Sequence, residues 1–218
     1  MTTLQTDGAA DPLPFVALSD FKAALSIADS DASQDTTLTD LLLAASAAVE
    51  SYIGRPILAA DYTDHIRIKP GDRLASFALD VRPALSVSSV LRHGQLLIDP
   101  PDGWDFSPST GVLYPPDGDG SWWGPGRYLV SYRAGWVVPG MKDPDGNLLP
   151  VTLPADIRQA VLTTARSFYA AKDRDPLLKS ESEQGIGSTS WSMPDATTGG
   201  LPADAAAFLS RYLSAGFS

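Results

Sequence analysis

The sequence predicts a protein of the α+β class, with helices on both sides of a long β region. Apolar residues recur at helical spacing before residue 56 and again after residue 153, whereas residues 61–132 consist of short alternating runs separated by Gly, Pro and Asp. No helical pattern separates these short runs. Strands that follow one another in this way pair antiparallel, which predicts an antiparallel sheet or a small sandwich.

The N-terminal helical pattern has two parts. Ser19 can cap a short helix whose apolar positions are Phe21, Ala24, Leu25 and Ala28. A longer helix is predicted from about Thr37 to Ile53. Its apolar stripe comprises Leu38, Leu41, Leu42, Ala45, Ala48, Val49, Tyr52 and Ile53. Gly54 suits the C-terminal cap, and Pro56 prevents the helix from continuing.

The β region is predicted from six runs. They are "DHIRI", "SFALDV", "SVSSVLRHGQLLI", "WDF", "GVLY" and "RYLVSYRAGW". Within the third run, His93–Gly94 has the composition of a tight hairpin turn. The loop "VVPGMKDPDGNLLPVT" then leads to the next helix.

The tetrapeptide "LPAD" begins two predicted helices, at Leu153–Asp156 and at Leu201–Asp204. In both, we expect Pro at the first helical position and Asp near the positive end of the helix dipole. The first helix has an apolar stripe of Ile157, Ala160, Val161, Thr164, Ala165 and Phe168. The second is short and has Phe208, Leu209, Tyr212 and Leu213 on one side. The Ser- and Gly-rich stretch between the helices is by itself a weak hairpin or a mobile arm.

Composition excludes several classes of protein. The 218 residues include no Cys, which removes disulfides, thiolate metal sites and a Cys nucleophile. Neither a signal-peptide pattern nor a membrane-spanning apolar run is present, so a soluble protein is expected. The net charge of −10 disfavours a protein that holds nucleic acid through phosphate contacts.

Catalytic and metal-binding patterns are weak. His65 and His93 are the only histidines, and neither has an accompanying motif. Asp117, Asp119 and Ser121 resemble the start of a calcium loop, but Trp122 and Tyr128 stand where that loop needs Gly and an acidic residue. No nucleophile elbow, P-loop or dinucleotide-binding motif occurs. We therefore expect no enzyme activity, no metal and no cofactor.

Five tryptophans allow a different function, the binding of sugar rings by stacking on the sheet. They are Trp104, Trp122, Trp123, Trp136 and Trp191. Aromatic residues in strands more often fill a core or a subunit interface. A carbohydrate- or surface-binding β module of a virion or a secreted assembly therefore remains the alternative.

The order of four segments resembles the head–tail connector, or adaptor, proteins of tailed bacteriophages and of gene transfer agents. These segments are "LTDLLLAASAAVESYIGRPI", "FALDVRPALSVSSVLRHGQLL", "YLVSYRAGW" and "LPADIRQAVLTTARSFYAAKDR". The stretch "LKSESEQGIGSTSWS" before "LPADAAAFLSRY" is similar to the C-terminal arm of this family. The sequence "EQGIGSTSW" departs from the usual hairpin pattern.

The resemblance implies an antiparallel helical core with an inserted antiparallel sheet or sandwich and an extended C-terminal hairpin-plus-helix arm. The expected parts are an N-terminal arm (1–17), helical core segments (18–56 and 137–174), the β insertion (57–136) and the C-terminal arm (175–218). Helical-core and ring-packing residues would be Leu38, Leu41, Leu42, Val49, Tyr52, Ile157, Val161 and Phe168. Portal-docking residues would be Lys179, Glu181, Trp191, Leu201, Phe208, Leu209, Tyr212 and Leu213.

The implied function is structural. Proteins of this family form a ring, commonly of twelve copies, between the portal and a stopper or other tail-proximal protein, and DNA passes through the lumen without specific binding during packaging and ejection. The chain would be made in the bacterial cytoplasm, would have no membrane partner and would reside at the head–tail junction. The terminal helix has two possible positions: docked on the portal, or packed against its own domain.

Overall fold

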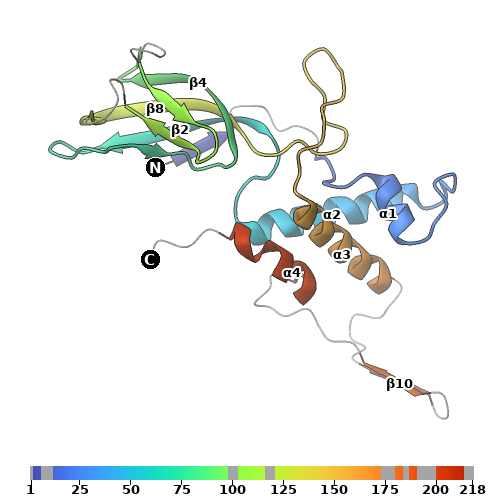
Figure 1. The fold of residues 1–218 in the computed structure, drawn as a ribbon. Helices are drawn as coiled ribbons and strands as arrows, with labels where there is room; N and C mark the ends of the chain where they lie inside the picture. The colour runs from blue at the N-terminus through green and yellow to red at the C-terminus, as the bar shows by residue number, and fades with distance from the viewer. Residues whose placement is uncertain are drawn as a thin grey trace. The chain divides into compact units, whose positions relative to one another are not determined.

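The computed structural model has an α+β fold and describes residues 2–5, 12–97, 103–115, 121–172, 180–183, 187–190 and 200–213 (Figure 1). The described helices are α1 (Leu18–Ala24), α2 (Asp35–Ile53), α3 (Ala155–Ala171), α4 (Ala203–Leu209) and the 3-10 turn η2 (Ser210–Tyr212). The strands are β1 (Thr2–Gln5), β2 (Ala60–Ile68), β3 (Phe77–Ala78), β4 (Ala84–Arg92), β5 (Gln95–Leu96), β6 (Asp105–Ser107), β7 (Val112–Tyr114), β8 (Gly126–Ala134), β9 (Ser180–Glu183) and β10 (Gly187–Ser190).

The chain forms two compact units. The β unit comprises residues 1–11 and 56–137, and the helical unit comprises residues 12–55 and 138–218. The sequence-based insertion at 57–136 differs from the second segment of the β unit by one residue at each end. The residues assigned to an N-terminal arm are divided between the units: β1 pairs antiparallel with β2, and Phe15 and Val16 are buried in the helical unit.

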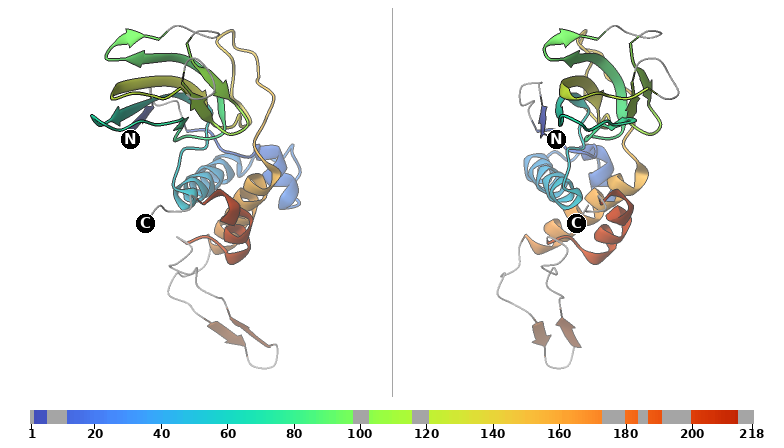
Figure 2. Two further views of the ribbon diagram at one scale, coloured as in Figure 1. Left: turned by 60° about the vertical axis from the view of Figure 1, so that its left-hand side comes forward. Right: turned by 90° about the vertical axis from the view of Figure 1, so that its left-hand side faces the viewer.

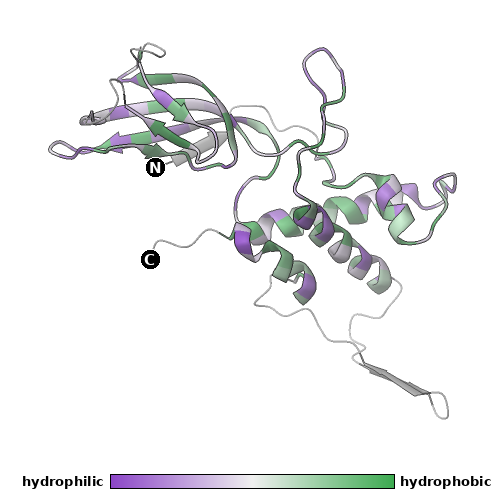
Figure 3. Cartoon of the chain, in the orientation of Figure 1, coloured by the Kyte–Doolittle hydropathy of each residue, from purple (hydrophilic) through white to green (hydrophobic). Residues whose placement is uncertain are grey.

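Two antiparallel sheets make up the β unit. One has the strand order β1-β2-β8-β4-β5, and the other has the order β3-β7-β6. Along β2 and β8, buried residues alternate with more exposed ones, as expected for strands with one face against a core. Figure 3 shows the hydropathy of the residues along these strands. His93 and Gly94 both have left-handed backbone angles, with φ of 53° and 83°, so the predicted turn between β4 and β5 is confirmed.

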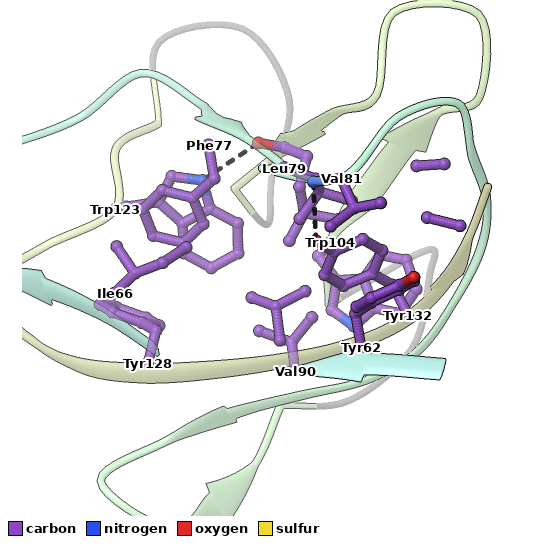
Figure 4. Close-up of a cluster of buried hydrophobic side chains, with 14 of the residues drawn as sticks. Tyr62, Ile66, Phe77, Leu79, Val81, Val90, Trp104, Trp123, Tyr128 and Tyr132 are labelled. Atoms are coloured by element: carbon purple, nitrogen blue, oxygen red, sulfur yellow. Dashed lines mark hydrogen bonds between the residues drawn. The ribbon is translucent and has the colours of Figure 1, made fainter. Parts of the chain in front are cut away.

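Aromatic side chains fill one end of the β-unit core (Figure 4). The rings of Phe77 and Trp123 stack with centroids 4.4 Å apart, and Tyr128 meets both rings edge-on at 5.3 and 5.4 Å. The indole N–H of Trp123 donates to the carbonyl of Leu113 at 3.4 Å. This cluster joins the larger sheet to the smaller one through apolar contact.

A buried polar network joins the larger sheet to the segment between β3 and β4. The Tyr132 hydroxyl donates to Asp64 Oδ1 at 3.0 Å. It also accepts from the backbone N–H of Val81 at 3.1 Å (Figure 4). Asp64 Oδ2 also accepts from the N–H of Asp80 at 3.1 Å. Burial raises the pKa of Tyr132 far above its usual value, and the nearby Asp64 raises it further. Tyr132 therefore stays protonated and donates to a carboxylate inside the core.

The helical unit is built on α2 and α3, which pack side by side (Figures 1 and 2). At the end of α3, Tyr169 and Lys172 donate to the side chain of Gln34, immediately before α2, at 3.4 and 3.0 Å. Near the same end, Arg166 donates to the Ala24 carbonyl of α1 at 2.7 Å. The end of α3 thus lies beside the start of α2, so the two helices run antiparallel.

The helix ends correct two details of the sequence-based prediction and confirm a third. Ser19 does not cap α1, because the helix begins at Leu18 and Ala17 occupies the cap position. The same helix ends at Ala24, and the left-handed backbone of Ser26, with φ of 60°, prevents its continuation. By contrast, the predicted end of α2 is confirmed: Gly54 has φ of 72°, and its N–H donates to the Glu50 carbonyl.

The prolines of the two "LPAD" segments lie one position earlier than predicted. Pro154 and Pro202 are the cap residues of α3 and α4, with extended ψ angles of 144° and 142°. Their carbonyls accept the first helical hydrogen bonds, from Arg158 and Ala206. The nitrogen of a cap residue donates no helical hydrogen bond, so proline at this position costs the helix none.

Candidate docking surface of the helical unit

The two helices that begin with "LPAD" pack against each other in the helical unit (Figure 2). The leucines that precede them, Leu153 and Leu201, are 8% and 1% exposed. Ala205 and Leu209 of α4 are fully buried, as are Ile157 and Val161 of α3. A short helix would be marginal alone, and this apolar contact supplies the tertiary packing that it needs.

A polar cluster fixes the end of the terminal helix. Asp156, in the first turn of α3, accepts a hydrogen bond from the Tyr212 hydroxyl at 2.7 Å and forms an ion pair with Arg211. The Arg211 guanidinium also donates to the Tyr212 hydroxyl at 3.0 Å and lies over its ring, 5.0 Å from the centroid. Burial raises the pKa of Tyr212, and its hydrogen bond to Asp156 raises the pKa further. The hydroxyl therefore remains a donor at neutral pH.

Two apolar side chains of the same segment face solvent. Phe208 and Leu213 are each 41% exposed, although Leu209 between them is buried. We call Phe208 and Leu213 the terminal apolar surface. The packing of α4 on α3 decides which side of the short helix is free, because Ala205 and Leu209 occupy the side that faces α3.

The structure divides the predicted portal-docking residues into three groups. Phe208 and Leu213 are exposed, and Tyr212 is half-buried beside Asp156. Leu201 and Leu209 differ from the prediction, because both are buried in their own unit and present no surface to a partner. Lys179 and Trp191 lie outside the described residues, and Glu181 is described only through its backbone, opposite Thr189 in the β9–β10 hairpin.

The residues assigned to the helical core lie on α2 and α3 as predicted. Five are fully buried: Leu38, Leu42, Val49, Ile157 and Val161. Leu41, Tyr52 and Phe168 are half-buried. A role of these residues in ring packing stays a prediction.

Sequence reasoning did not find the polar cluster at the end of η2. It assigned Asp156 to the helix dipole and did not single out Arg211. The sequence gives little indication of this contact, because Tyr212 lies 56 residues from Asp156. Only the packing of α4 on α3 brings the two side chains together.

The tryptophans do not form a stacking platform in the part of the β unit that is described. Trp123 is 2% exposed and Trp104 is 8% exposed, so both belong to the core. Trp136 is half-buried, and Trp122 is 53% exposed. Trp191 lies outside the described residues. The core position of Trp104 and Trp123 removes the basis for a carbohydrate-binding face at these rings.

Among the described residues, the remaining candidate sites also lack a reactive arrangement. His65 and His93 are both exposed, on β2 and in the β4–β5 turn. Asp117 and Asp119 lie outside the described residues. Where the structure describes the chain, it contains no group of three or more acidic or histidine side chains that could hold a metal ion. None of the described helices has the length and apolar character needed to cross a bilayer.

The whole chain shares its fold with chains from solved gene transfer agent (GTA) particles. One belongs to the virion of a native GTA particle, with 17% identity, a TM-score of 0.57 and coverage of 100% of this chain and 98% of that chain. A second belongs to the neck of an empty GTA particle computed with C6 symmetry, with 16% identity and a TM-score of 0.56. A third belongs to the neck of a native GTA particle computed with C12 symmetry, with 16% identity and a TM-score of 0.53. Both have the same coverage as the first.

These structural likenesses show the fold, at identities too low to show more. No family profile matches the chain. No curated protein matches it either.

Proposed function

We propose that the chain is a structural, non-enzymatic head–tail adaptor of a phage or phage-like particle. Copies form a ring, of twelve in the simplest case, between the portal and a stopper or other tail-proximal protein, and DNA crosses the lumen without specific binding. The observation that supports this most is the shared fold over the entire chain with chains of GTA particles, two of them from particle necks computed with C6 and C12 symmetry.

The charge of the chain supports a channel through which DNA passes without being held. The net charge is −10, and 26 acidic side chains outnumber 16 basic ones. A surface with this excess repels phosphates at long range, which disfavours a tight DNA complex.

The C-terminal segment is the proposed contact with the portal. Phe208 and Leu213 are exposed although Ala205, Ala206 and Leu209 of α4 are buried, so this terminal apolar surface is free to be buried by a partner. The β9–β10 hairpin precedes it in the chain and belongs to the same arm. Leu201 and Leu209 support the arm from inside the helical unit rather than touch the portal.

Electron microscopy of the purified chain, alone and mixed with the portal protein of the same particle, tests the adaptor function. We expect rings that sit on one end of the portal. The paired variant Phe208→Asp with Leu213→Asp should lose portal binding without a change in thermal unfolding, because both side chains are exposed.

A matched control pair is Leu148→Asp with Val151→Asp, which lie in the loop before α3 and are 69% and 52% exposed. The control should bind the portal as the wild type does. Absence of rings in both the free and the mixed sample would refute the adaptor function. Normal portal binding by the Phe208 and Leu213 variant would refute the docking role of this surface alone.

A further inference from the structure

A pocket of about 250 Å³ opens at one end of the larger sheet, where β2 ends, β8 begins and the β4–β5 hairpin turns. We call it the basic pocket, and its lining includes Arg67, Pro70, His93, Pro125, Gly126 and Arg127. It brings two guanidinium groups and an imidazole together in a chain whose overall charge is strongly negative.

The two arginines of the pocket are direct cross-strand neighbours. Arg67 of β2 stands opposite Arg127 of β8, and both are exposed on the face directed away from the core. Like charges directly opposite each other destabilise a sheet. Among the described residues, neither guanidinium has a hydrogen bond or an ion pair. An anion bound between the two guanidinium groups would offset this repulsion.

The wall of the pocket is held in place by its own contacts. The N–H of His93 donates to the Arg127 carbonyl at 2.9 Å, and Arg92 donates to the Pro125 carbonyl at 3.0 Å. The His93 ring lies so close to the backbone that a Cβ added at Gly126 would come within 2.9 Å of its Nε2 atom. The β4–β5 turn therefore places the His93 imidazole against the backbone of Gly126, next to the arginine pair.

An acidic loop on the helical unit has the complementary charge. The segment between α1 and α2, residues 25–34, contains Asp29 and Asp31 and no basic residue, and both aspartates are exposed. The buried Lys22 secures the base of this loop by donating to the Asp29 carbonyl at 3.1 Å and pairing with Asp35 at 2.5 Å. Hydrogen bonds from Ser33 lower the pKa of Asp31 and keep it ionised.

We propose that the basic pocket of one copy binds the carboxylates of the acidic loop of the next copy. This inference rests on the proposed ring. A closed ring needs two different surfaces on each chain that fit each other head to tail, and a basic pocket on the β unit with an acidic loop on the helical unit meets that need. Carboxylates also match the planar fork of arginine, which binds them through two parallel hydrogen bonds. The long-range charge of the chain disfavours DNA as the occupant.

Two charge-reversal variants test the pairing. The pocket variant is Arg67→Glu with Arg127→Glu, and the loop variant is Asp29→Lys with Asp31→Lys. Either variant alone should reduce the ring fraction, measured by mass photometry with and without portal, at least tenfold. An equimolar mixture should recover rings, because Glu pockets then meet Lys loops and Arg pockets meet Asp loops around an alternating ring.

The control is Arg73→Glu with Lys142→Glu, which makes the same change in net charge as the pocket variant, at exposed residues outside the pocket and the loop. It should form rings like the wild type, and all variants should keep the wild-type unfolding temperature. Rings from either charge-reversal variant alone would overturn the inference, and so would a mixture that forms no rings. In both cases the proposed function still stands if the wild type forms rings. The inference would also be overturned if the wild type binds a 20-base-pair DNA duplex and the pocket variant does not. The pocket would then be a site for phosphate groups. Failure of the wild type to form rings would refute the adaptor function itself.

Discussion

Asp156→Ala is expected to release the terminal helix from the helical unit while the rest of the unit stays folded. The substitution removes the acceptor of the Tyr212 hydroxyl, the partner of Arg211 and a negative charge in the first turn of α3. A hydrogen bond to a charged group contributes about 1.5–3 kcal/mol, which we reduce to about 1–2 kcal/mol because Tyr212 is only half-buried. The charge of Asp156 at the start of α3 stabilises α3 itself, which stays folded when α4 opens, so this contribution does not add to the opening. The ion pair contributes little, because Arg211 is 68% exposed and solvent screens it.

The lost hydrogen bond of about 1–2 kcal/mol corresponds to roughly a 5- to 30-fold increase in opening of α4. Amide hydrogen exchange measures that opening at the N–H groups of residues 206–209. The removed carboxylate contacts η2, and among the described residues it has no hydrogen bond or ion pair with α2, so exchange in α2 should change much less than exchange in α4.

Asp204→Ala is the matched control, since it alters the corresponding aspartate of the second "LPAD" segment. Asp204 is exposed in the first turn of α4 and has no hydrogen bond or ion pair among the described residues. Only the helix-dipole contribution is lost, which predicts roughly a 2- to 5-fold increase in exchange. Equal effects of the two substitutions would refute the reasoning, as would unchanged protection of α4 in Asp156→Ala.

Three further substitutions test the cores of the two units. Tyr132→Phe should cost about 1–3 kcal/mol in urea denaturation, because buried Asp64 loses a donor. Since folding raises the pKa of Tyr132 above its ordinary value of 10.0, wild-type stability should fall as the pH rises past about 10, and the variant should lose that dependence. Gly135→Ala should cost roughly 2–6 kcal/mol, because φ is 104° and the new Cβ would overlap the Leu58 carbonyl oxygen. Leu209→Ala should cost about 2–5 kcal/mol in the same assay, because it leaves a cavity between α4 and α3.

Each of these substitutions has a control of the same chemistry. Tyr114→Phe changes a tyrosine that is 43% exposed and should leave stability almost unaltered. Gly146 shares a positive φ of 87°, but a Cβ added there would have no atom within 4 Å, so Gly146→Ala reports conformational strain without the clash. Phe208→Ala removes an exposed ring and should cost far less than Leu209→Ala. A reversed order within any pair would contradict the burial on which the prediction depends.

Local sequence signals predicted most element types correctly. The apolar stripe that begins at Leu38 and the glycine at position 54 predicted α2 correctly. Both signals act between residues that lie within one or two helical turns of each other. His93–Gly94 defined its hairpin turn through backbone angles that glycine adopts readily. The pairing of β1 with the edge of β2 was not predicted, since its register joins Thr2 to a residue more than sixty positions later.

The same limit applies to the candidate sites. The helical spacing of Phe208, Leu209, Tyr212 and Leu213 placed them on one side of a helix, but it did not decide which would be buried. The basic pocket was not predicted either, because Arg67 and Arg127 become neighbours only through the register of β2 with β8. Charge clusters that depend on strand pairing leave no local pattern in the sequence.

The two copies of "LPAD" show where local determination ends. The sequence by itself determined that each would start a helix, because a proline cap and an aspartate in the first turn act within four residues. Only the tertiary structure decided that Asp156 receives Tyr212 and Arg211 whereas Asp204 faces solvent. The physical reason is that a carboxylate gains a distant partner only where buried apolar surfaces, here those of α3 and α4, hold the two segments together.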